Sequence, residues 1–502
     1  MRLCGAKLFI RSVCDRVYGT VARVVYSRLF PGLIKSQTGR LNKSPHTVHA
    51  IANRYKQSGR TAYFIWHMAG GALNRYAACR FIAFIALFAL FAFSAPSFND
   101  TAAQSSEQTR EFHETYDLAP GGVVSVNNTS GYIRVTSWGE DRVKVDAVIR
   151  GRRDEDLGQV QIQVTPRPGR SDRPDRIDIR TVYARGDGDR LSVDYDLKVP
   201  RGAVLNALTT TSGRITVYDA VARVTANSTS GPITVREVTG DATLSSTNGD
   251  ITADRVGGSL VVTATSGNLV IGEVASTLNA RCNNCNISAR GLRNDATVRT
   301  ANGSIELERI GGRVNAETTN GRIRINDVGA GVIATSYSNS ITVTNARGFV
   351  VANALNGGVV IRNAGEGARA SSVGGSVQIS DSKGRIEADT TNGPISLANI
   401  DGKDVSAKSA NGGVLFSGRF YESGRYVFFS ANGNVVLTLP PESNFNLTVK
   451  SDNGSINTEF PLKLEPGAQL GRGPIVGVIG RGGAEVQAIS ANGAVHIKKA
   501  PQ

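Results

Sequence analysis

Histidine, methionine and tryptophan are scarce in this chain of 502 residues. It has two methionines, two tryptophans and 6% aromatic residues, and beyond residue 67 its only histidines are His113 and His496, near opposite ends. A Ser-His-Asp triad or a histidine-rich metal site is hard to build from two such histidines. The HExxH, GxSxG and Walker patterns are also missing. We therefore expect no enzymatic activity and no catalytic, cofactor-binding or metal-binding residues.

The body of the chain also lacks an excess of basic residues, although the net charge is +15. Residues 1–80 contain 14 Lys/Arg and one acid, Asp15, which leaves 43 basic and 41 acidic residues in 81–502. Binding of a nucleic acid needs a basic stripe that neutralises phosphates. The nearly neutral body therefore predicts no nucleic-acid partner.

One uninterrupted apolar run occurs, at residues 81–93, after Arg75 and Arg80 and before several small residues. This order is typical of a secretory signal peptide, and the run is shorter than the ~20 residues that span a bilayer. We assign residues 68–103 to the signal-peptide region, with cleavage between residues 94 and 104. The protein is then exported to the periplasm, the outer surface or the extracellular space.

The position of this leader inside the chain bears on where translation starts. A signal peptide belongs at the N-terminus, and Met68 is the only methionine besides Met1. The preferred interpretation is that translation starts at Met68 and that the basic extension 1–67 is not made. The alternatives are an uncleaved inner-membrane anchor, with membrane contact only through the apolar segment, and a basic tail on anionic lipid.

Glycine is abundant, with 56 residues, and much of it belongs to a repeated phrase such as TNGRIRI. The Gly position of this phrase steps by 18 residues from Gly213 to Gly393. Two and four residues after it the side chains are apolar, which indicates a strand with one face inward. A second Gly-rich position divides the unit into two nine-residue halves. Such a unit buries its apolar face only by stacking, so we predict an all-β fold, a parallel β-solenoid.

The mature chain divides into three parts on this basis. Residues 111–205 alternate apolar and polar side chains between hairpin-like loops, and we predict that they form an antiparallel β cap on the first coil. Residues 206–411 are the regular solenoid. Residues 412–502 contain stretched repeats and aromatic residues, and we predict irregular C-terminal coils and a second cap.

Two columns of polar residues accompany the repeat. Asn precedes the Gly position in many coils, where it suits a tight turn and can form a hydrogen-bonded ladder. The second column lies at another turn and contains Asp219, Glu237, Glu273, Asp327, Asp381, Asn345, Asn363 and Asn399. We interpret it as Asx-turn chemistry; a polysaccharide-cleaving carboxylate pair and a Ca²⁺ site are the alternatives. The cell-attachment tripeptide Arg185–Asp187 is interpreted as a hairpin turn.

Two cysteines interrupt the turn column. Cys282 and Cys285 are the only cysteines beyond the leader, and their CNNC sequence replaces an Asn-Gly turn. Because exported compartments are oxidising, we predict a structural disulfide between them. Free thiols and a redox or metal-binding role are the alternatives.

Three segments resemble the bacterial putative-adhesin family, an exported β-solenoid domain of unknown function. They are DLKVPRGAVLNALTTTSGRITV (Asp196–Val217), VVLTLPPESNFNLTVKSDNGSI (Val435–Ile456) and SANGAVHIKK (Ser490–Lys499). The resemblance covers roughly residues 115–500. It implies surface adhesion and supplies no catalytic residues.

We therefore expect a non-enzymatic binding or structural protein of the cell envelope. Its contacts would be multivalent, along a ladder of outward side chains such as Thr216, Thr234, Thr252 and Arg324. The partner would be an envelope polymer, a cell surface or another protein. A polysaccharide-active enzyme on the same scaffold and a membrane-anchored accessory of envelope-stress signalling are the alternatives.

Overall fold

The computed structural model describes residues 107–169, 172–184, 191–219, 221–464 and 473–501. Strands make up most of this part, and α5 (Asp154–Leu157) is its one helix. No helix among the described residues is long and apolar enough to cross a membrane. The leader, the start site and the tripeptide at 185–187 lie outside the described residues.

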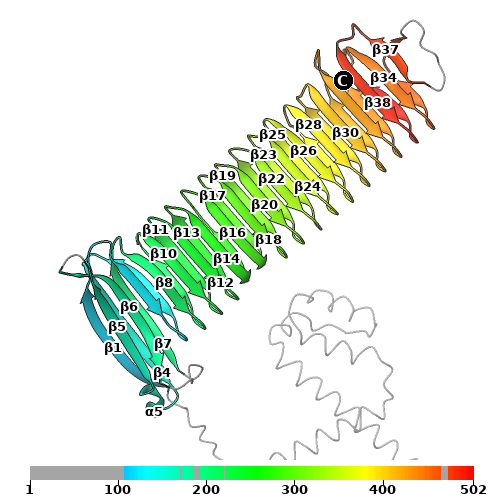
Figure 1. Ribbon diagram of the computed structural model, residues 1–502. Helices are drawn as coiled ribbons and strands as arrows, with labels where there is room; N and C mark the ends of the chain where they lie inside the picture. The colour runs from blue at the N-terminus through cyan, green and yellow to red at the C-terminus, as the bar shows by residue number, and fades with distance from the viewer. Residues whose placement is uncertain (1–106, 170–171, 185–190, 220, 465–472, 502) are drawn as a thin grey trace, which may run out of the picture. The chain divides into compact units, whose positions relative to one another are not determined.

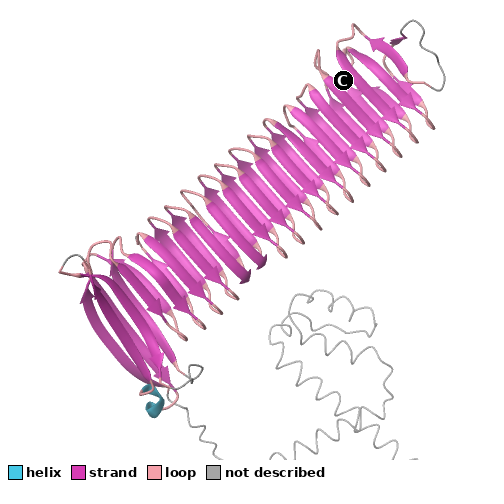
Figure 2. Ribbon diagram, viewed as in Figure 1, coloured by secondary structure: helices cyan, strands magenta, loops and turns pink. Residues whose placement is uncertain are grey.

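The strands stack in two ladders that run along a solenoid (Figures 1 and 2). In spatial order the first ladder is β1 (Gln108–Asp117), β4 (Arg142–Gly151), β7 (Ser192–Pro200), β3 (Ile133–Trp138), β9 (Ile215–Tyr218), β11 (Ile233–Val238), β13 (Ile251–Val256), β15 (Leu269–Ile271), β17 (Ile287–Leu292), β19 (Ile305–Ile310), β21 (Ile323–Val328), β23 (Ile341–Ala346), β25 (Val359–Ala364), β27 (Val377–Ser380), β29 (Ile395–Ile400), β31 (Val414–Gly418), β33 (Val435–Leu439), β39 (Val495–Lys499) and β35 (Ile456–Thr458).

The second ladder, again in spatial order, is β5 (Val160–Pro168), β6 (Pro174–Tyr183), β2 (Val123–Asn127), β8 (Val204–Thr210), β10 (Arg223–Ser228), β12 (Ala242–Ser246), β14 (Leu260–Ser266), β16 (Leu278–Asn284), β18 (Ala296–Thr300), β20 (Val314–Thr318), β22 (Val332–Ser336), β24 (Val350–Ala354), β26 (Gly367–Ser372), β28 (Arg385–Thr390), β30 (Asp404–Ser409), β32 (Arg425–Ser430), β38 (Ala484–Ser490), β34 (Phe445–Ser451), β37 (Ile475–Ile479) and β36 (Leu462–Leu464).

The regular coils pair in parallel with the predicted 18-residue step. Ile305 pairs with Ile323 in the first ladder, and Val314 pairs with Val332 in the second. Both predicted aliphatic columns are buried through all eleven coils from Ile215 to Leu397. The prediction of a parallel β-solenoid with two half-repeats per coil is therefore confirmed, and its interior is a thin core filled by aliphatic side chains.

The N-terminal cap is antiparallel on its outer side, where β1, β4 and β7 pair, as predicted. Its inner side differs, because β3 lies parallel between β7 and β9, and β2 lies parallel between β6 and β8. The strands β2 and β3 form a coil around the sequence TSGYIRV at Thr129–Val135, an earlier copy of the repeat that the sequence analysis missed. The cap strands β4 to β7 are inserted between this copy and the next one, at Gly213.

The C-terminal end is also assembled out of sequence order. The last coil, β38 and β39, lies between the coil of β32 and β33 and the coil of β34 and β35. Antiparallel strands β37 and β36 finish the second ladder. Stacked, tilted and edge-on aromatic rings pack together at this end, among them Phe416, Phe420, Tyr426, Phe428 and Phe445.

Candidate binding surfaces

The turn between the two half-repeats is held by an amide ladder on its outside. Nδ2 of Asn302 donates to Oδ1 of Asn284 at 2.8 Å, and Nδ2 of Asn320 donates to Oδ1 of Asn302 at 2.6 Å. The same ladder continues near the C-terminus through Asn392, Asn411, Asn432, Asn492 and Asn453. Because these amides bond to one another, the column serves mainly to fix the turn.

A ladder of buried hydroxyl groups, which the sequence analysis did not identify, runs beneath these turns. A buried Ser or Thr lies three residues before the Gly position in most coils. In one coil Thr318 donates from Oγ1 to the carbonyl of Gly303 at 3.0 Å, and Oγ1 accepts from the amide of Gly321 at 3.0 Å. Each hydroxyl thus closes its own turn and ties it to the preceding coil. The sequence signal was present, as Ser or Thr in phrases such as TTNG and SANG.

The cysteine pair occupies these same two positions in its own coil. Cys282 replaces the buried hydroxyl residue and pairs in register with Thr300, and Cys285 stands in the Gly position. The structure places the two sulfur atoms against each other, with the Cα atoms 5.8 Å apart, and both side chains are buried. A disulfide here would replace the hydroxyl-to-amide hydrogen bond of the other coils. Its formation in the protein remains a prediction.

The column of acids and amides lies at a sharp bend at the end of the first-ladder strands. Most of its members have a positive φ, between 53° for Asp381 and 70° for Asp219. Asn and Asp adopt this conformation more readily than other non-glycine residues, which explains their enrichment and agrees with the turn interpretation. Asn399 also donates to Asp381 at 3.0 Å, and Asn363 donates to Asn345 at 2.9 Å.

The column is different in five consecutive coils, where an open groove of about 930 Å³ lies along the bend. Its bend positions are occupied by Glu237, Arg255, Glu273, Gly291 and Arg309 instead of a run of Asn and Asp. The remaining charged side chains that line the groove are Asp254, Arg290 and Arg293. The groove joins charged side chains of both signs from five coils, and it is the candidate binding site.

Arg255 is the one groove arginine with ion-pair partners among the described residues. It contacts Glu237 at 2.5 Å and Asp254 at 3.2 Å, and the hydrogen bond that it donates to Glu237 raises its pKa. In the part of the chain that the structure describes, Arg290, Arg293 and Arg309 form no ion pair. The same part contains no group of His, Cys, Asp and Glu that could hold a metal ion.

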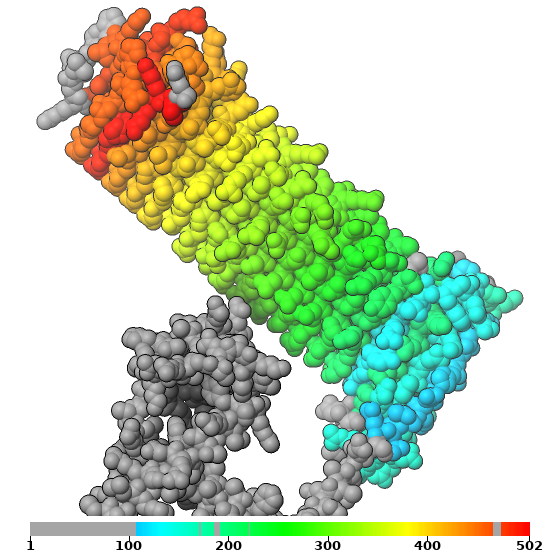
Figure 3. Space-filling model, turned by 180° about the vertical axis from the view of Figure 1, so that it is seen from behind, coloured from blue at the N-terminus to red at the C-terminus, as the bar shows by residue number. Residues whose placement is uncertain are grey.

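The predicted outward ladder is only partly accessible. Arg324 is exposed and lies 3.8 Å from Glu306, and Thr234 and Thr252 are half-buried. Thr216 is 8% exposed, so the prediction that it presents its side chain to a ligand is wrong. Its register neighbour in β3 is the longer Arg134, on the coil that the sequence analysis missed. Figure 3 shows one face of this stack as a continuous surface.

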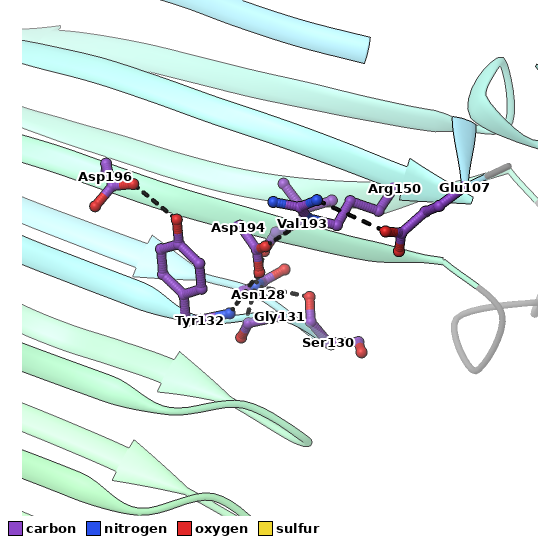
Figure 4. Close-up of polar contacts among 9 residues, drawn as sticks. All are labelled: Glu107, Asn128, Ser130, Gly131, Tyr132, Arg150, Val193, Asp194 and Asp196. Carbon is purple, nitrogen blue, oxygen red and sulfur yellow. Dashed lines mark hydrogen bonds and ion pairs between the residues drawn. The ribbon is translucent and has the colours of Figure 1, made fainter. Parts of the chain in front are cut away.

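A polar network joins the first coil to the N-terminal cap (Figure 4). Asn128, which is 2% exposed, donates to the carbonyl of Val193 at 2.7 Å. Asp194 accepts from the amide of Tyr132 at 3.0 Å and from Nε of Arg150 at 2.8 Å. Burial, together with the hydrogen bond to a neighbouring aspartate, raises the pKa of Tyr132. These groups bond to one another, so the network is a structural brace.

The two histidines beyond the leader lie at opposite ends of the solenoid, on β1 and β39. His113 contacts Asp146 at 2.8 Å and Glu111 at 3.0 Å. His496 lies 3.4 Å from Nδ2 of Asn457. They therefore cannot act in one site.

Comparison with known proteins places a family domain in the C-terminal part. Residues 328–498, about a third of the chain, match the Toastrack DUF4097 family, a domain of unknown function. Over these residues, the match confirms the resemblance to a domain family of unknown function. A crystal structure of a putative cell adhesion protein from Clostridium sporogenes ATCC 15579 is 8% identical and covers 78% of this chain and 100% of that one. The TM-score between the two structures is 0.16. No curated protein matches the chain.

Proposed function

We propose that the protein, which carries a Toastrack domain on a β-solenoid, is an exported rod that binds without catalysis. Its partner is an envelope polymer, a cell surface or another protein. The observation that carries the proposal is the filled core: both inward columns are aliphatic and buried. A ligand therefore meets only outward side chains, which repeat from coil to coil, and weak contacts add up along the rod.

Of the four carboxyl groups of the described residues with a shifted pKa, three have a lowered one, and Asp389, which does not line the groove, has a pKa raised by burial and by the charge of Glu387. Hydrogen bonds from Lys144 and His113 outweigh burial and lower the pKa of Asp146, and those from Arg176 and Arg167 do the same for Asp178. A carboxylate held in its charged form by cations is a structural ion pair. A general acid needs the opposite shift, next to a partner group, in a site that a substrate can enter.

Deletion of one coil tests the rod. Removing residues 339–356, one whole period outside the charged groove, joins Ser338 to Gly357 and keeps every inward column in register. We expect the fold to survive and binding of the full chain to isolated cell-envelope polymer to fall only modestly. Removing nine residues, 348–356, should shift one half-repeat onto the other and damage folding.

The same polymer assay distinguishes a non-catalytic binding rod from a polysaccharide-cleaving enzyme. Release of reducing ends from the polymer, abolished by a single carboxylate substitution in a folded variant, would replace the rod with a localised active site. Complete loss of binding on removal of the one distant coil would equally contradict multivalent contact.

A further inference from the structure

The charged groove is a local departure from the repeat. In later coils the bend position is taken by Asp327, Asn345 and Asn363, which suit its positive φ. In the groove Arg255 and Arg309 adopt the same conformation, with φ of 54° and 55°. Arginine is disfavoured there, and a disfavoured backbone conformation is found preferentially at functional sites.

Gly291 opens the middle of this groove. Its φ is +70°, and a Cβ at this position would lie 3.4 Å from Cγ of Glu273. No side chain fills the bend in this coil, while Arg290 and Arg293 flank it and are exposed. The coil therefore supplies a hollow that both Arg290 and Arg293 line.

The charges in the groove favour an anion. Glu237 and Asp254 both form ion pairs with Arg255. Among the described residues, three guanidinium groups without an ion pair then remain, those of Arg290, Arg293 and Arg309, and the one lining carboxylate left to oppose them is Glu273. Guanidinium groups present a planar fork of donors that matches a carboxylate.

We propose that this groove binds a strand of acidic polysaccharide through the carboxylates of its sugars. The groove is open and crosses five coils, which lie about 4.8 Å apart, so it suits an extended chain better than a small molecule. Arg290 and Arg309 come from adjacent coils and can each meet a separate carboxylate. The inference deepens the proposed function, on which it rests, by assigning a site and a ligand class.

The repeat itself supplies a matched control. Arg362 lies in the register column of Arg290 four coils further on, and Arg347 follows Arg293 by three periods. The groove variant R290Q/R293Q and the control variant R347Q/R362Q therefore lose the same charge at the same places in the repeat. Only the first pair lines the groove.

The experiment measures binding of the full chain to polygalacturonate by calorimetry, with neutral dextran and inorganic polyphosphate as comparison polymers. We expect the groove variant to bind polygalacturonate about ten-fold more weakly or worse, and the control variant to lose less than about two-fold. Circular dichroism confirms that both variants keep the fold.

Each other outcome overturns part of the inference. Equal losses in the two variants would mean non-specific attraction, and tighter binding of polyphosphate would exclude carboxylate recognition. Failure of the wild-type chain to bind polygalacturonate, while it still binds envelope polymer, would sink the groove assignment and leave the rod intact. Failure of the wild-type chain to bind either polymer would refute both the groove assignment and the proposed binding rod.

Discussion

The buried hydroxyl ladder allows a quantitative test at Thr318. Replacing Thr318 with valine keeps the shape and the β-branched side chain but removes the hydroxyl. Two hydrogen bonds of 3.0 Å are lost, and the buried amide of Gly321 is left without its acceptor. A neutral hydrogen bond contributes about 0.5–1.5 kcal/mol, and an unsatisfied buried group costs about 1–3 kcal/mol. We expect a local destabilisation of about 2–3 kcal/mol.

The assay must report on one coil, because solenoid coils unfold in local units. Native-state hydrogen exchange at the Gly321 amide does so, and a loss of about 2 kcal/mol should accelerate exchange about 30-fold. The matched control is Thr342→Val, on the outward face, whose hydroxyl makes no hydrogen bond within the described residues. It should change stability by less than about 0.5 kcal/mol.

A natural gap in the ladder supplies the reverse experiment. Ala354 stands at a hydroxyl position, three residues before Gly357, and is buried. Ala354→Ser should slow exchange at the Gly357 amide by about five- to ten-fold, equivalent to about 1 kcal/mol. Similar exchange rates in T318V and T342V, or faster exchange in A354S, would refute the stabilising role of the ladder.

Four further predictions concern other parts of the chain. Arg309→Asn should stabilise its coil by about 0.5–1 kcal/mol, because Asn suits the bend, and urea unfolding would show this. Cys282 and Cys285 should resist alkylation in protein from the envelope, and two labelled thiols would disprove the disulfide. Mass spectrometry of the native N-terminus should find it between residues 95 and 104; peptides from 1–60 would contradict the start at Met68. Hydrogen bonds to Asp146 and Glu111 raise the pKa of His113 above 6.5. The stabilisation of the cap by protonated His113 is therefore complete below pH 6.5 and is lost as the pH rises through the raised pKa. Thermal unfolding of the His113→Gln variant should lack this pH dependence.

The sequence predicted the regular coils because every coil meets the same environment. The columns beginning at Ile215 and Val217 repeat one burial pattern eleven times, so each copy supports the interpretation of the others. The bend column was also interpreted correctly, because Asn and Asp mark a positive φ on their own. Local conformation and fixed spacing were sufficient for both predictions.

The features that the sequence analysis missed depend on contacts that the 18-residue repeat does not describe. The copy at Gly131 was hidden because the cap strands β4 to β7 separate it from Gly213 in the sequence, although the two stack directly. The groove was missed because it combines different columns of five coils. A signal did exist, since Arg255 and Arg309 occupy positions where other coils have Asn or Asp.

The order of the terminal coils explains how the rod protects its ends. A solenoid that followed sequence order would finish on the chain terminus, which could fray and would expose a parallel strand edge. Here β38 and β39 pair on both sides, so releasing the last coil breaks two interfaces instead of one. At the other end β2 and β3 are enclosed in the same way under β6 and β7. Antiparallel strands finish both ladders at the N-terminal end and the second ladder at the C-terminal end, where the first ladder ends on the short parallel strand β35. The faces and edges along the stack, including the charged groove, are therefore the surfaces best placed for binding.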